Sequence, residues 1–246
     1  MNQRQKILSI SGVLTYSLGI LIGLALSGWS VWAEVEATLL VFPKDVPRIS
    51  LNCPLMLSNH ESGIVLVWLD NPTAETINPT TQMVISHPNL PRTETTVVPL
   101  KPGEKKLMEW TVGPDDTVFG GLILVNLFET SQSDFPAHQG SCGIPVSKLP
   151  GLTGKQVYIL MFAASILAIF SGGILWGSGH PKMKESIRTV TNAGITLAVL
   201  VCAGVLLSLT QWWGLGLAIF LAALMLIAVI LTQFVLFPSV PANRMK

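Results

Sequence analysis

Three histidines and two methionines are the residues whose types and spacing most resemble a metal site. Met56 precedes His60 by four residues, Met83 precedes His87 by four, and His138 follows further along the chain. Thioether and imidazole groups suit copper, so copper handling is one hypothesis. On a single strand, however, positions i and i+4 lie about 13 Å apart at roughly 3.3 Å per residue. We interpret the three histidines as turn residues and keep them as the candidate metal ligands.

Hydrolytic chemistry has less support in the sequence. The chain lacks Gly-x-Ser-x-Gly, His-Glu-x-x-His and a Gly-rich phosphate loop. Asp115 and Asp116 stand in "GPDD", a turn composition in which aspartate bonds nearby backbone. Glu109 alternates with apolar residues on an expected strand, which is typical of a solvated face. We therefore predict a protein that is not an enzyme and that holds no cofactor.

Composition places the chain at a membrane. Half of its residues are apolar and only 12% are charged, against about 25% in a typical soluble domain. The segment from 34 to 150 contains seven lysines and arginines and thirteen aspartates and glutamates, whereas the remainder is basic and apolar. No cluster of cations forms a stripe on a polar element, so nucleic acid is excluded as a partner.

Three apolar runs in the C-terminal third are long enough to cross a bilayer. They cover 156–177, 190–210 and 214–237, and none contains a charged residue. A hydrocarbon core of about 30 Å needs roughly 20 helical residues. We expect three transmembrane helices, with a cytoplasmic loop at 178–189 and a cytoplasmic tail at 238–246.

The positive-inside rule sets the expected orientation. Seven cations lie before the apolar run at 7–33, between the runs at 156–177 and 190–210, or at the C-terminus: Arg4, Lys6, Lys182, Lys184, Arg188, Arg244 and Lys246. All seven fall on the cytoplasmic side if the acidic segment lies outside the cytoplasm. The tryptophans expected at the outer membrane interface are Trp29, Trp32, Trp212 and Trp213. The localisation predicted is an inner (plasma) membrane, with residues 35–150 outside and the C-terminus inside.

Residues 1–33 are either a cleavable signal peptide or a first transmembrane helix. Ala33 and Val31 occupy the −1 and −3 positions of a secretory cleavage site before Glu34. The apolar run from 7 to 33 is longer than the 7–15 residues typical of a signal peptide, which favours a retained helix. The sequence leaves both alternatives open.

The acidic segment, 35–148, reads as an all-β domain. Expected strands cover 37–42, 48–57, 63–70, 80–86, 94–100, 105–112, 120–128 and 141–146, separated by turns rich in Pro, Gly, Asn and Asp. Seven or eight short strands at this spacing predict an antiparallel sandwich. The strand 63–70 is apolar on both faces, as a central strand would be. The fold class expected is mixed, an Ig-like β-sandwich with three or four transmembrane helices.

Two of the three cysteines lie in the segment expected outside the cytoplasm. Cys53 falls in an early strand and Cys142 in the last one. Export to an oxidising compartment makes a disulfide between them the expectation. Cys202 lies within a transmembrane run, where we interpret it as a small packing residue.

The β segment resembles a known family of domains. The stretch "VLVWLDNPTAETINP", followed by "LKPGEKKLMEWTV" and "GLILVNLFE", is similar to bacterial cell-envelope Ig-like domains of the conserved-repeat kind. In these a strand ending in Asn-Pro precedes an L-x-P-G-E turn and a further strand. The resemblance implies adhesion, scaffolding or subunit contact and supplies no catalytic residue. The multi-helix base departs from the single anchor that is usual there.

Together these observations predict a membrane-anchored cell-envelope protein whose β-sandwich is an interaction module or accessory subunit. The expected partners are the lipid bilayer and other membrane or envelope proteins. Two alternatives remain open. The first is periplasmic or extracellular copper handling by His60, His87 and His138. The second is an accessory role in a transporter, in which a partner would supply the polar pathway that these helices lack.

Overall fold

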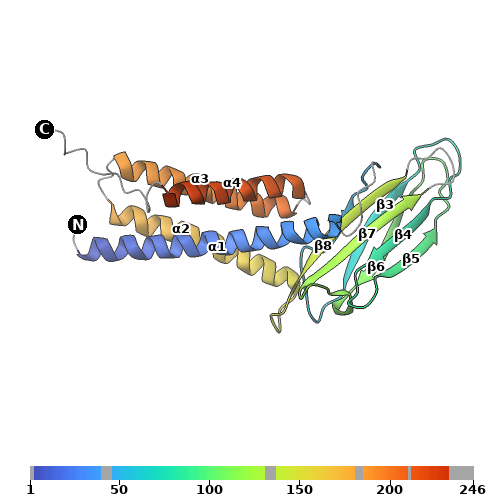
Figure 1. Cartoon of the computed structure of the whole chain (residues 1–246), viewed down its shortest axis with the longest axis horizontal. Helices are drawn as coiled ribbons and strands as arrows, with labels where there is room; N and C mark the ends of the chain where they lie inside the picture. Colours follow the sequence, from blue (N-terminus) through green and yellow to red (C-terminus); the bar gives the residue numbers. More distant parts are fainter. Residues whose placement is uncertain (1–2, 40–45, 131–136, 181–184, 210–211, 233–246) are drawn as a thin grey trace. The chain divides into compact units, whose positions relative to one another are not determined.

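The computed structural model describes residues 3–39, 46–130, 137–180, 185–209 and 212–232. These residues form four α-helices, one short 3-10 helix and eight strands (Figure 1). The chain divides into two compact units. Met1–Gly28 and Leu160–Lys246 form a helical unit, and Trp29–Ile159 forms a β unit that also contains the end of the first helix and the start of the second.

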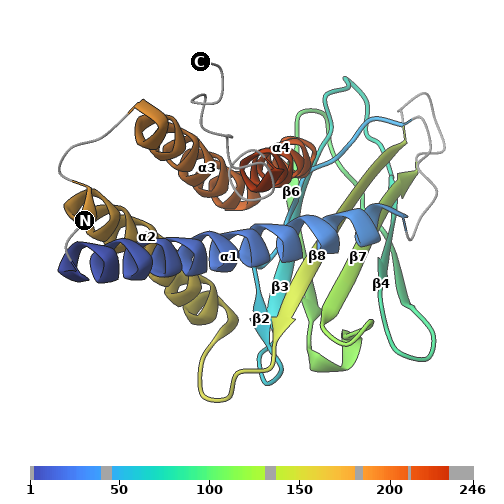
Figure 2. The ribbon, with the colours of Figure 1, turned by 60° about the vertical axis from the view of Figure 1, so that its left-hand side comes forward.

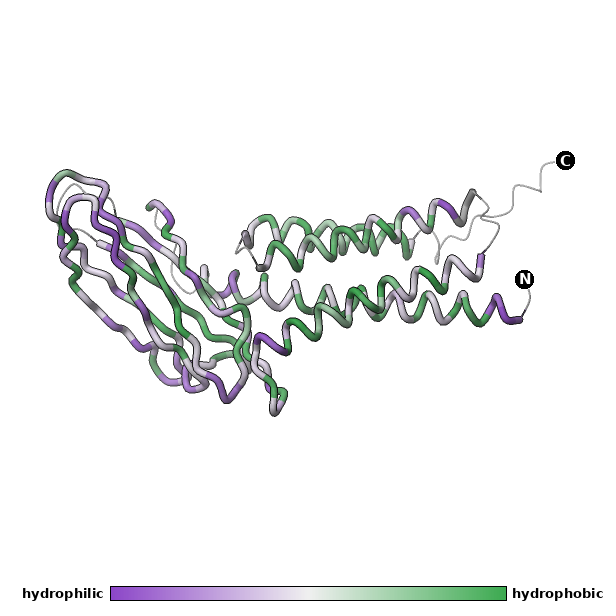
Figure 3. The backbone as a smooth tube through the Cα atoms, turned by 180° about the vertical axis from the view of Figure 1, so that it is seen from behind, coloured by the Kyte–Doolittle hydropathy of each residue, from purple (hydrophilic) through white to green (hydrophobic). Residues whose placement is uncertain are grey.

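The described helices are α1 (Gln3–Leu39), α2 (Gly154–Gly179), α3 (Glu185–Leu209) and α4 (Trp213–Leu231). Each is long and apolar enough to cross a membrane, which is consistent with the predicted membrane localisation. Apolar residues predominate along most of each helix, whereas the strands alternate (Figure 3). The expected residues 233–237 of the last span and the tail 238–246 lie outside the described residues.

Small residues set the packing inside the helical unit. A Cβ atom at Gly19 would lie 2.8 Å from the backbone nitrogen of Ile169, so α1 and α2 approach closely there. The Ser165 hydroxyl of α2 donates a hydrogen bond of 2.8 Å to the Gly19 carbonyl. A buried apolar cluster joins all four helices, with Ile20, Leu24, Ile169, Leu197, Val201 and Ala223 at its centre. Close backbone contact between small residues is a usual way for membrane helices to associate.

The strands form two sheets. Within the described residues, sheet A has the order β2 (Leu57–Ser58), β8 (His138–Ser147), β7 (Leu122–Thr130), β4 (Thr80–Ile85) and β5 (Arg92–Val97). Sheet B has the order β1 (Leu51–Asn52), β3 (Gly63–Asp70) and β6 (Lys105–Val112). All paired neighbours are antiparallel except β2 and β8, which are parallel, so the expectation of a purely antiparallel sandwich is wrong at that pair.

The exception follows from a proline. The expected single strand 48–57 is interrupted after Asn52, because Pro54 has no backbone N–H to donate to a ladder. The chain then re-enters β structure as β2, which pairs with β8 of the other sheet. Strands β3 and β6, by contrast, have the bounds that the sequence predicts.

The two sheets enclose one apolar core, which confirms the expected two-sheet architecture. The strands contribute alternate residues, among them Val65, Val67, Leu69, Trp110, Val112, Ile123, Val125, Leu127 and Ile144. A disulfide joins Cys53, just after β1 of sheet B, to Cys142 in β8 of sheet A, as predicted. Burial of this cluster is the main favourable term in forming the β unit.

The end of α1 covers the outer face of sheet A. In Figure 2 the end of α1 crosses in front of β8 and β7. Ala33 and Ala37 are fully buried and pack on Leu122 and Leu124 of β7. The expected strand 37–42 is therefore wrong for residues 37–39, which are helical, and its remainder lies outside the described residues. Small side chains one helical turn apart let the helix approach the sheet, and this contact outweighs the β propensity of the local sequence.

Gly143 in β8 allows this approach. A Cβ atom at that position would lie 2.0 Å from the Ala33 carbonyl oxygen. Nearby, the Thr38 and Ser141 hydroxyls lie 3.3 Å apart. The first turn of α2 is held separately, because the Gly154 N–H donates a 2.8 Å hydrogen bond to the Glu61 carboxylate. An acidic group is favourable at a helix N-terminus. Both helix ends within the β unit are thus fixed to the sandwich.

Candidate interaction surface

The outer face of sheet B exposes apolar side chains of β3. The residues that face the core, such as Val65 and Val67, are buried, and those between them point outward. Ile64 is 52% exposed and Trp68 is 60% exposed, while Leu66 between them is half-buried. The strand is central in its sheet, as predicted, but within the β unit no described element covers its second apolar face. We call Ile64, Leu66, Trp68 and the neighbouring Leu107 of β6 the apolar row.

Strand β6 extends this row sideways. The register places Leu107 opposite Trp68, Glu109 opposite Leu66, and Thr111 opposite Ile64. Leu107 is half-buried and Glu109 is exposed, as expected for the solvated side of an alternating strand. Directly opposed residues on one sheet face have Cβ atoms within about 5.5 Å, so Trp68 and Leu107 form one apolar contact surface.

β6 is also the edge of sheet B. Among the described residues no strand pairs with the side of β6 opposite to β3. In an antiparallel sheet, successive residues direct their backbone groups to opposite edges. The Thr111 carbonyl accepts a 2.7 Å hydrogen bond from the Arg92 guanidinium of β5, away from β3. On the β3 side, the Glu104 carbonyl accepts from the Asn71 N–H. The odd-numbered residues of β6 therefore present their backbone N–H and C=O groups to the open edge.

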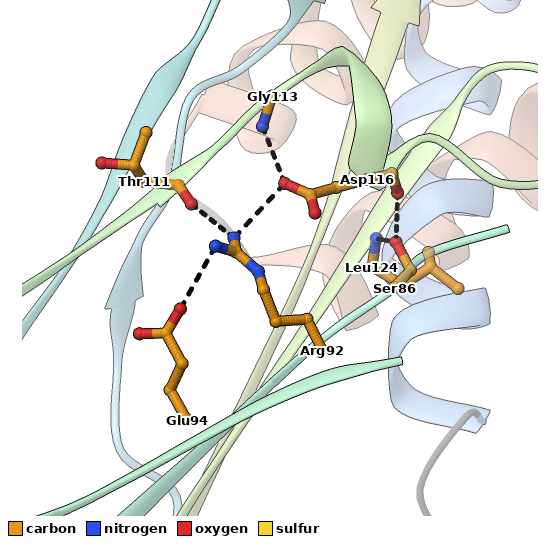
Figure 4. A network of polar contacts seen from close by, with 7 residues as sticks. All are labelled: Ser86, Arg92, Glu94, Thr111, Gly113, Asp116 and Leu124. Atoms are coloured by element: carbon orange, nitrogen blue, oxygen red, sulfur yellow. Dashed lines mark hydrogen bonds and ion pairs between the residues drawn. The ribbon is translucent and has the colours of Figure 1, made fainter. Parts of the chain in front are cut away.

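One end of this edge is closed by a polar network (Figure 4). The Arg92 guanidinium lies 3.4 Å from the buried Asp116 carboxylate and 3.2 Å from the Glu94 carboxylate, besides its bond to Thr111. The Asp116 carboxylate also accepts a 2.8 Å hydrogen bond from the Gly113 N–H. This is the local backbone bonding predicted for the aspartates of "GPDD". Because the network occupies the Thr111 carbonyl, the free part of the edge runs from 105 to 109.

The same turn is tied to sheet A through Ser86. The Ser86 hydroxyl donates a 2.7 Å hydrogen bond to the Asp116 carbonyl and accepts one of 2.9 Å from the Leu124 N–H (Figure 4). All three groups are buried, where a hydrogen bond left unmade would cost about 1 to 3 kcal/mol. The network therefore has a structural role, joining the two sheets at the end of β6.

At the other end of β6, residues of the motif that resembles the family hydrogen-bond to one another around the buried Asn71 side chain. The Asn71 side-chain amide lies 2.8 to 3.0 Å from the carbonyl oxygens of Glu75, Leu100 and Lys101. Its carbonyl oxygen accepts from the backbone and side chain of Thr73. Asparagine in the "DNP" segment thus holds the "LKPGE" turn, in which Gly103 has a positive φ of 70°. The motif is a folding element of the sandwich.

The three candidate metal ligands stand in different parts of the β unit. His60 is exposed after β2, His87 follows β4 and is half-buried, and His138 begins β8. Met56 and Met83 are buried, and Met83 belongs to the apolar core. Throughout the described residues, no group of three or more His, Cys, Asp and Glu side chains is arranged to hold a metal ion.

His138 instead forms an ion pair with Glu129, its register partner on β7. The His138 Nδ1 and Glu129 Oε2 atoms are 3.1 Å apart, and the Glu129 side chain is 2% exposed. Burial raises the pKa of the Glu129 carboxyl above its ordinary value, Asp70 adds to the rise, and the charge of His138 opposes it. The sequence carried no signal for this pair, because it depends on the register of two strands.

Two other side chains, a thiol and an imidazole, lie in the helical unit. Cys202 is a free, half-buried thiol in α3. His180 follows α2 and is half-buried. Its ring lies 4.3 Å from that of Trp176, centroid to centroid, and its Nδ1 atom is 3.1 Å from the Trp176 carbonyl.

The residues expected at the membrane boundaries are only partly described. Trp32 and Trp212 are exposed, and Trp29 is less so, its ring facing Gly121 of the β unit. Arg4 and Lys6 lie in the first turns of α1, and Arg188 lies in the first turn of α3. The side chain of Trp213 and the expected cytoplasmic cations Lys182, Lys184, Arg244 and Lys246 lie outside the described residues.

Comparison with known proteins adds little. No family model matches the chain, and no curated protein is similar to it. Among solved structures, the CARDB domain of the PF1109 protein from Pyrococcus furiosus, in complex with di-metal ions, is 12% identical, with a TM-score of 0.32, covering 44% of this chain and 94% of that one.

Two further structures are enzymes. A cycloisomaltooligosaccharide glucanotransferase from Paenibacillus sp. is 18% identical, with a TM-score of 0.33 and 42% of this chain covered. Red sea bream transglutaminase is 14% identical, with a TM-score of 0.35 and 44% covered. The chain spans only 14% and 17% of these two proteins. At these scores the likenesses carry no argument about activity.

Proposed function

We propose that this protein is a membrane-anchored interaction module whose β-sandwich binds a protein partner through the outer face of sheet B. The observation that carries the proposal is the apolar row. Trp68 and Ile64 are more than half exposed on a well-paired central strand. Exposed aromatic and aliphatic side chains in a contiguous patch mark interaction sites on soluble surfaces, and tryptophan is enriched among the residues that dominate binding energy.

The proposed setting is an inner membrane crossed by the apolar helices. The sandwich lies outside the cytoplasm, where its disulfide is stable, and the C-terminus lies inside. The charge distribution of the sequence supports this orientation, and the disulfide between Cys53 and Cys142 agrees with an oxidising compartment. The bilayer and other membrane or envelope proteins are the partners in this proposal.

The first helix stays attached in the mature protein under this proposal. Its last turns, containing Ala33 and Ala37, are buried against Leu122 and Leu124, so removing residues 1–33 would remove part of the sandwich's cover. The intact mass of the protein purified from membranes tests this point. A mature chain that begins at Glu34 would contradict it.

A photo-reactive amino acid in place of Trp68 tests the proposed binding face in native membranes. We expect irradiation to produce a higher-mass adduct that carries this chain. The matched control is the same amino acid at Leu90, which is apolar and 78% exposed but lies in the turn between β4 and β5. Absence of an adduct at position 68, or equal labelling at both positions, would contradict the proposed function.

A further inference from the structure

We propose that the partner of the sandwich is a second copy of this chain, joined to the first by antiparallel pairing of the two β6 edges around Leu107. This inference rests on the proposed function, because it names the partner of the same surface. The result would be a two-fold symmetric dimer with a continuous sheet made from two copies of sheet B. Each copy would present the same residues to the other, as in any isologous interface.

The open edge has the backbone pattern that such pairing needs. The odd-numbered residues of β6 direct their N–H and C=O groups outward, as the bond from Arg92 to the Thr111 carbonyl shows. Two antiparallel strands pair through residues that both point toward the shared edge. A two-fold axis through Leu107 satisfies this condition. It pairs Leu107 with Leu107 of the second copy, and Lys105 with Glu109 in both directions.

Charge complementarity selects this register. Lys105, Leu107 and Glu109 share the outer face of sheet B, so the two-fold axis brings opposite charges together twice, on either side of an apolar centre. In the single chain, the Lys105 Nζ atom forms only a long ion pair, 3.8 Å from the Oδ2 atom of the exposed Asp70. Shifting the axis to Glu109 would oppose two glutamates. Shifting it to Lys106 would oppose the two copies of Lys106 and place Lys105 against Leu107. Opposite charges across a strand pair stabilise it, and like charges destabilise it.

The pairing also explains the exposure of the apolar row. Trp68 lies opposite Leu107 in the register of β3 and β6. In the dimer one continuous apolar line would run from Trp68 through both copies of Leu107 to the second Trp68. The polar network at Thr111 ends the paired segment, because Arg92 already occupies that carbonyl. Five residues, 105 to 109, are therefore available from each chain.

β5, the longer edge strand of sheet A, lacks these features. Every residue of β5 is exposed, and its sequence, "RTETTV", has no apolar residue before Val97. Arg92 and Glu94 of β5 are already paired with each other at 3.2 Å. Charged and polar residues on an edge strand are a usual protection against pairing. β5 therefore provides the matched control edge within the same unit.

Charge exchange on the full-length protein in mild detergent or nanodiscs tests the register. We expect Lys105→Glu and Glu109→Lys each to weaken dimerisation about tenfold, because the symmetry turns two favourable pairs into two like-charge pairs. The double variant restores the pairs and should return the dissociation constant to within about threefold of the original. Lys106→Glu, with the same change of charge on the adjacent residue, is the control and should have little effect. Mass photometry or sedimentation gives the dimer fraction.

Cysteine cross-linking tests the position of the axis. Residues paired by hydrogen bonds across antiparallel strands have Cα atoms about 5.5 Å apart, which is within the range of a disulfide. In a Cys202→Ser background, Leu107→Cys should give a covalent dimer on mild oxidation, and Val97→Cys on β5 should not. Each variant is first checked for an intact Cys53–Cys142 disulfide and an unchanged melting temperature, so that misfolding is recognised.

The results separate this inference from the proposed function. A wild-type protein that stays monomeric, a dimer insensitive to both single charge variants, or equal cross-linking at positions 107 and 97 would overturn the β6 dimer. If the photo-adduct at position 68 then has the mass of a different chain, the interaction module stands and its partner is another protein. If position 68 gives no adduct and the protein is monomeric, both proposals fail.

Discussion

The outer faces of the two sheets carry similar apolar residues but have different surroundings. On sheet A, Leu122 and Leu124 are buried beneath Ala33 and Ala37 of α1. On sheet B, the corresponding positions of β3 expose Trp68 and its neighbours. A sheet in a sandwich normally has one solvated, polar face. An apolar outer face therefore signals a second layer, which the chain itself supplies for sheet A.

Removing the disulfide is expected to lower the unfolding free energy more than any other change, because it is the covalent link between sheet A, which α1 covers, and sheet B, whose outer face is exposed. Replacing Cys53 and Cys142 by serine releases a closed loop whose ends are 89 residues apart. The chain-entropy model gives a loss of about 4 to 5 kcal/mol in unfolding free energy. Thermal or denaturant unfolding of the full chain in detergent measures it. A loss well below 1 kcal/mol would mean that the disulfide adds little to the contacts that already hold the two sheets together.

A pair of truncations tests the contrast directly. Leu124→Ala removes a fully buried side chain beneath α1 and should cost about 2 to 5 kcal/mol. Trp68→Ala, on the bare face, should change the unfolding free energy of the monomer by no more than about 0.5 kcal/mol. Measurements at a dilution where the protein is monomeric keep association out of the comparison. Equal losses would show that the two faces are equally covered.

Gly143→Ala tests how closely α1 approaches sheet A. The added methyl group would collide with the Ala33 backbone, which no side-chain rotation relieves, so a loss of about 1 to 3 kcal/mol is expected. Gly121→Ala is the control, since a Cβ atom there would meet its nearest atom at 3.5 Å. If the two variants have the same stability, the helix end does not pack on β8 as described.

The smallest effect concerns Glu129. Burial raises the pKa of the Glu129 carboxyl, so the folded state favours its neutral form. The stability that this gives is fully present below the ordinary glutamate pKa. It is lost as the pH rises through the pKa of the folded state. Glu129→Gln should therefore be more favourable, relative to wild type, at pH 8 than at pH 4. Melting temperatures at the two pH values measure this. A pH-independent difference would mean that the carboxyl titrates normally.

The sequence predicted elements best where local chemistry bounds them. Strands β3 and β6 have the expected limits because the turn residues of "DNP", "KPGE" and "GPDD" end or begin a strand at a definite residue. The disulfide followed from the number and compartment of the cysteines. The candidate interaction surface is predictable only in part. The strand 63–70 is apolar on both faces, which predicts burial on both sides, whereas Ile64 and Trp68 on its outer face are exposed in the structure.

The errors arise where distant residues decide the structure. Residues 37–39 open an apolar stretch that reads as a strand, but in the structure they continue α1, where Ala37 packs on Leu122 and Leu124, more than eighty positions away. Likewise, nothing near Leu57 indicates parallel pairing with Val146. The ion pair of Glu129 and His138 depends on the pairing register of β7 and β8.

The contact between Ala33 and Gly143 has a consequence for synthesis. The helix end is made more than a hundred residues before the strand on which it packs, and that strand lies in the interior of sheet A, between β2 and β7. Contacts between residues far apart in the chain form slowly, and partly folded intermediates expose apolar surface. The edge of β7 that pairs with β8 therefore stays unpaired in the nascent chain until β8 emerges.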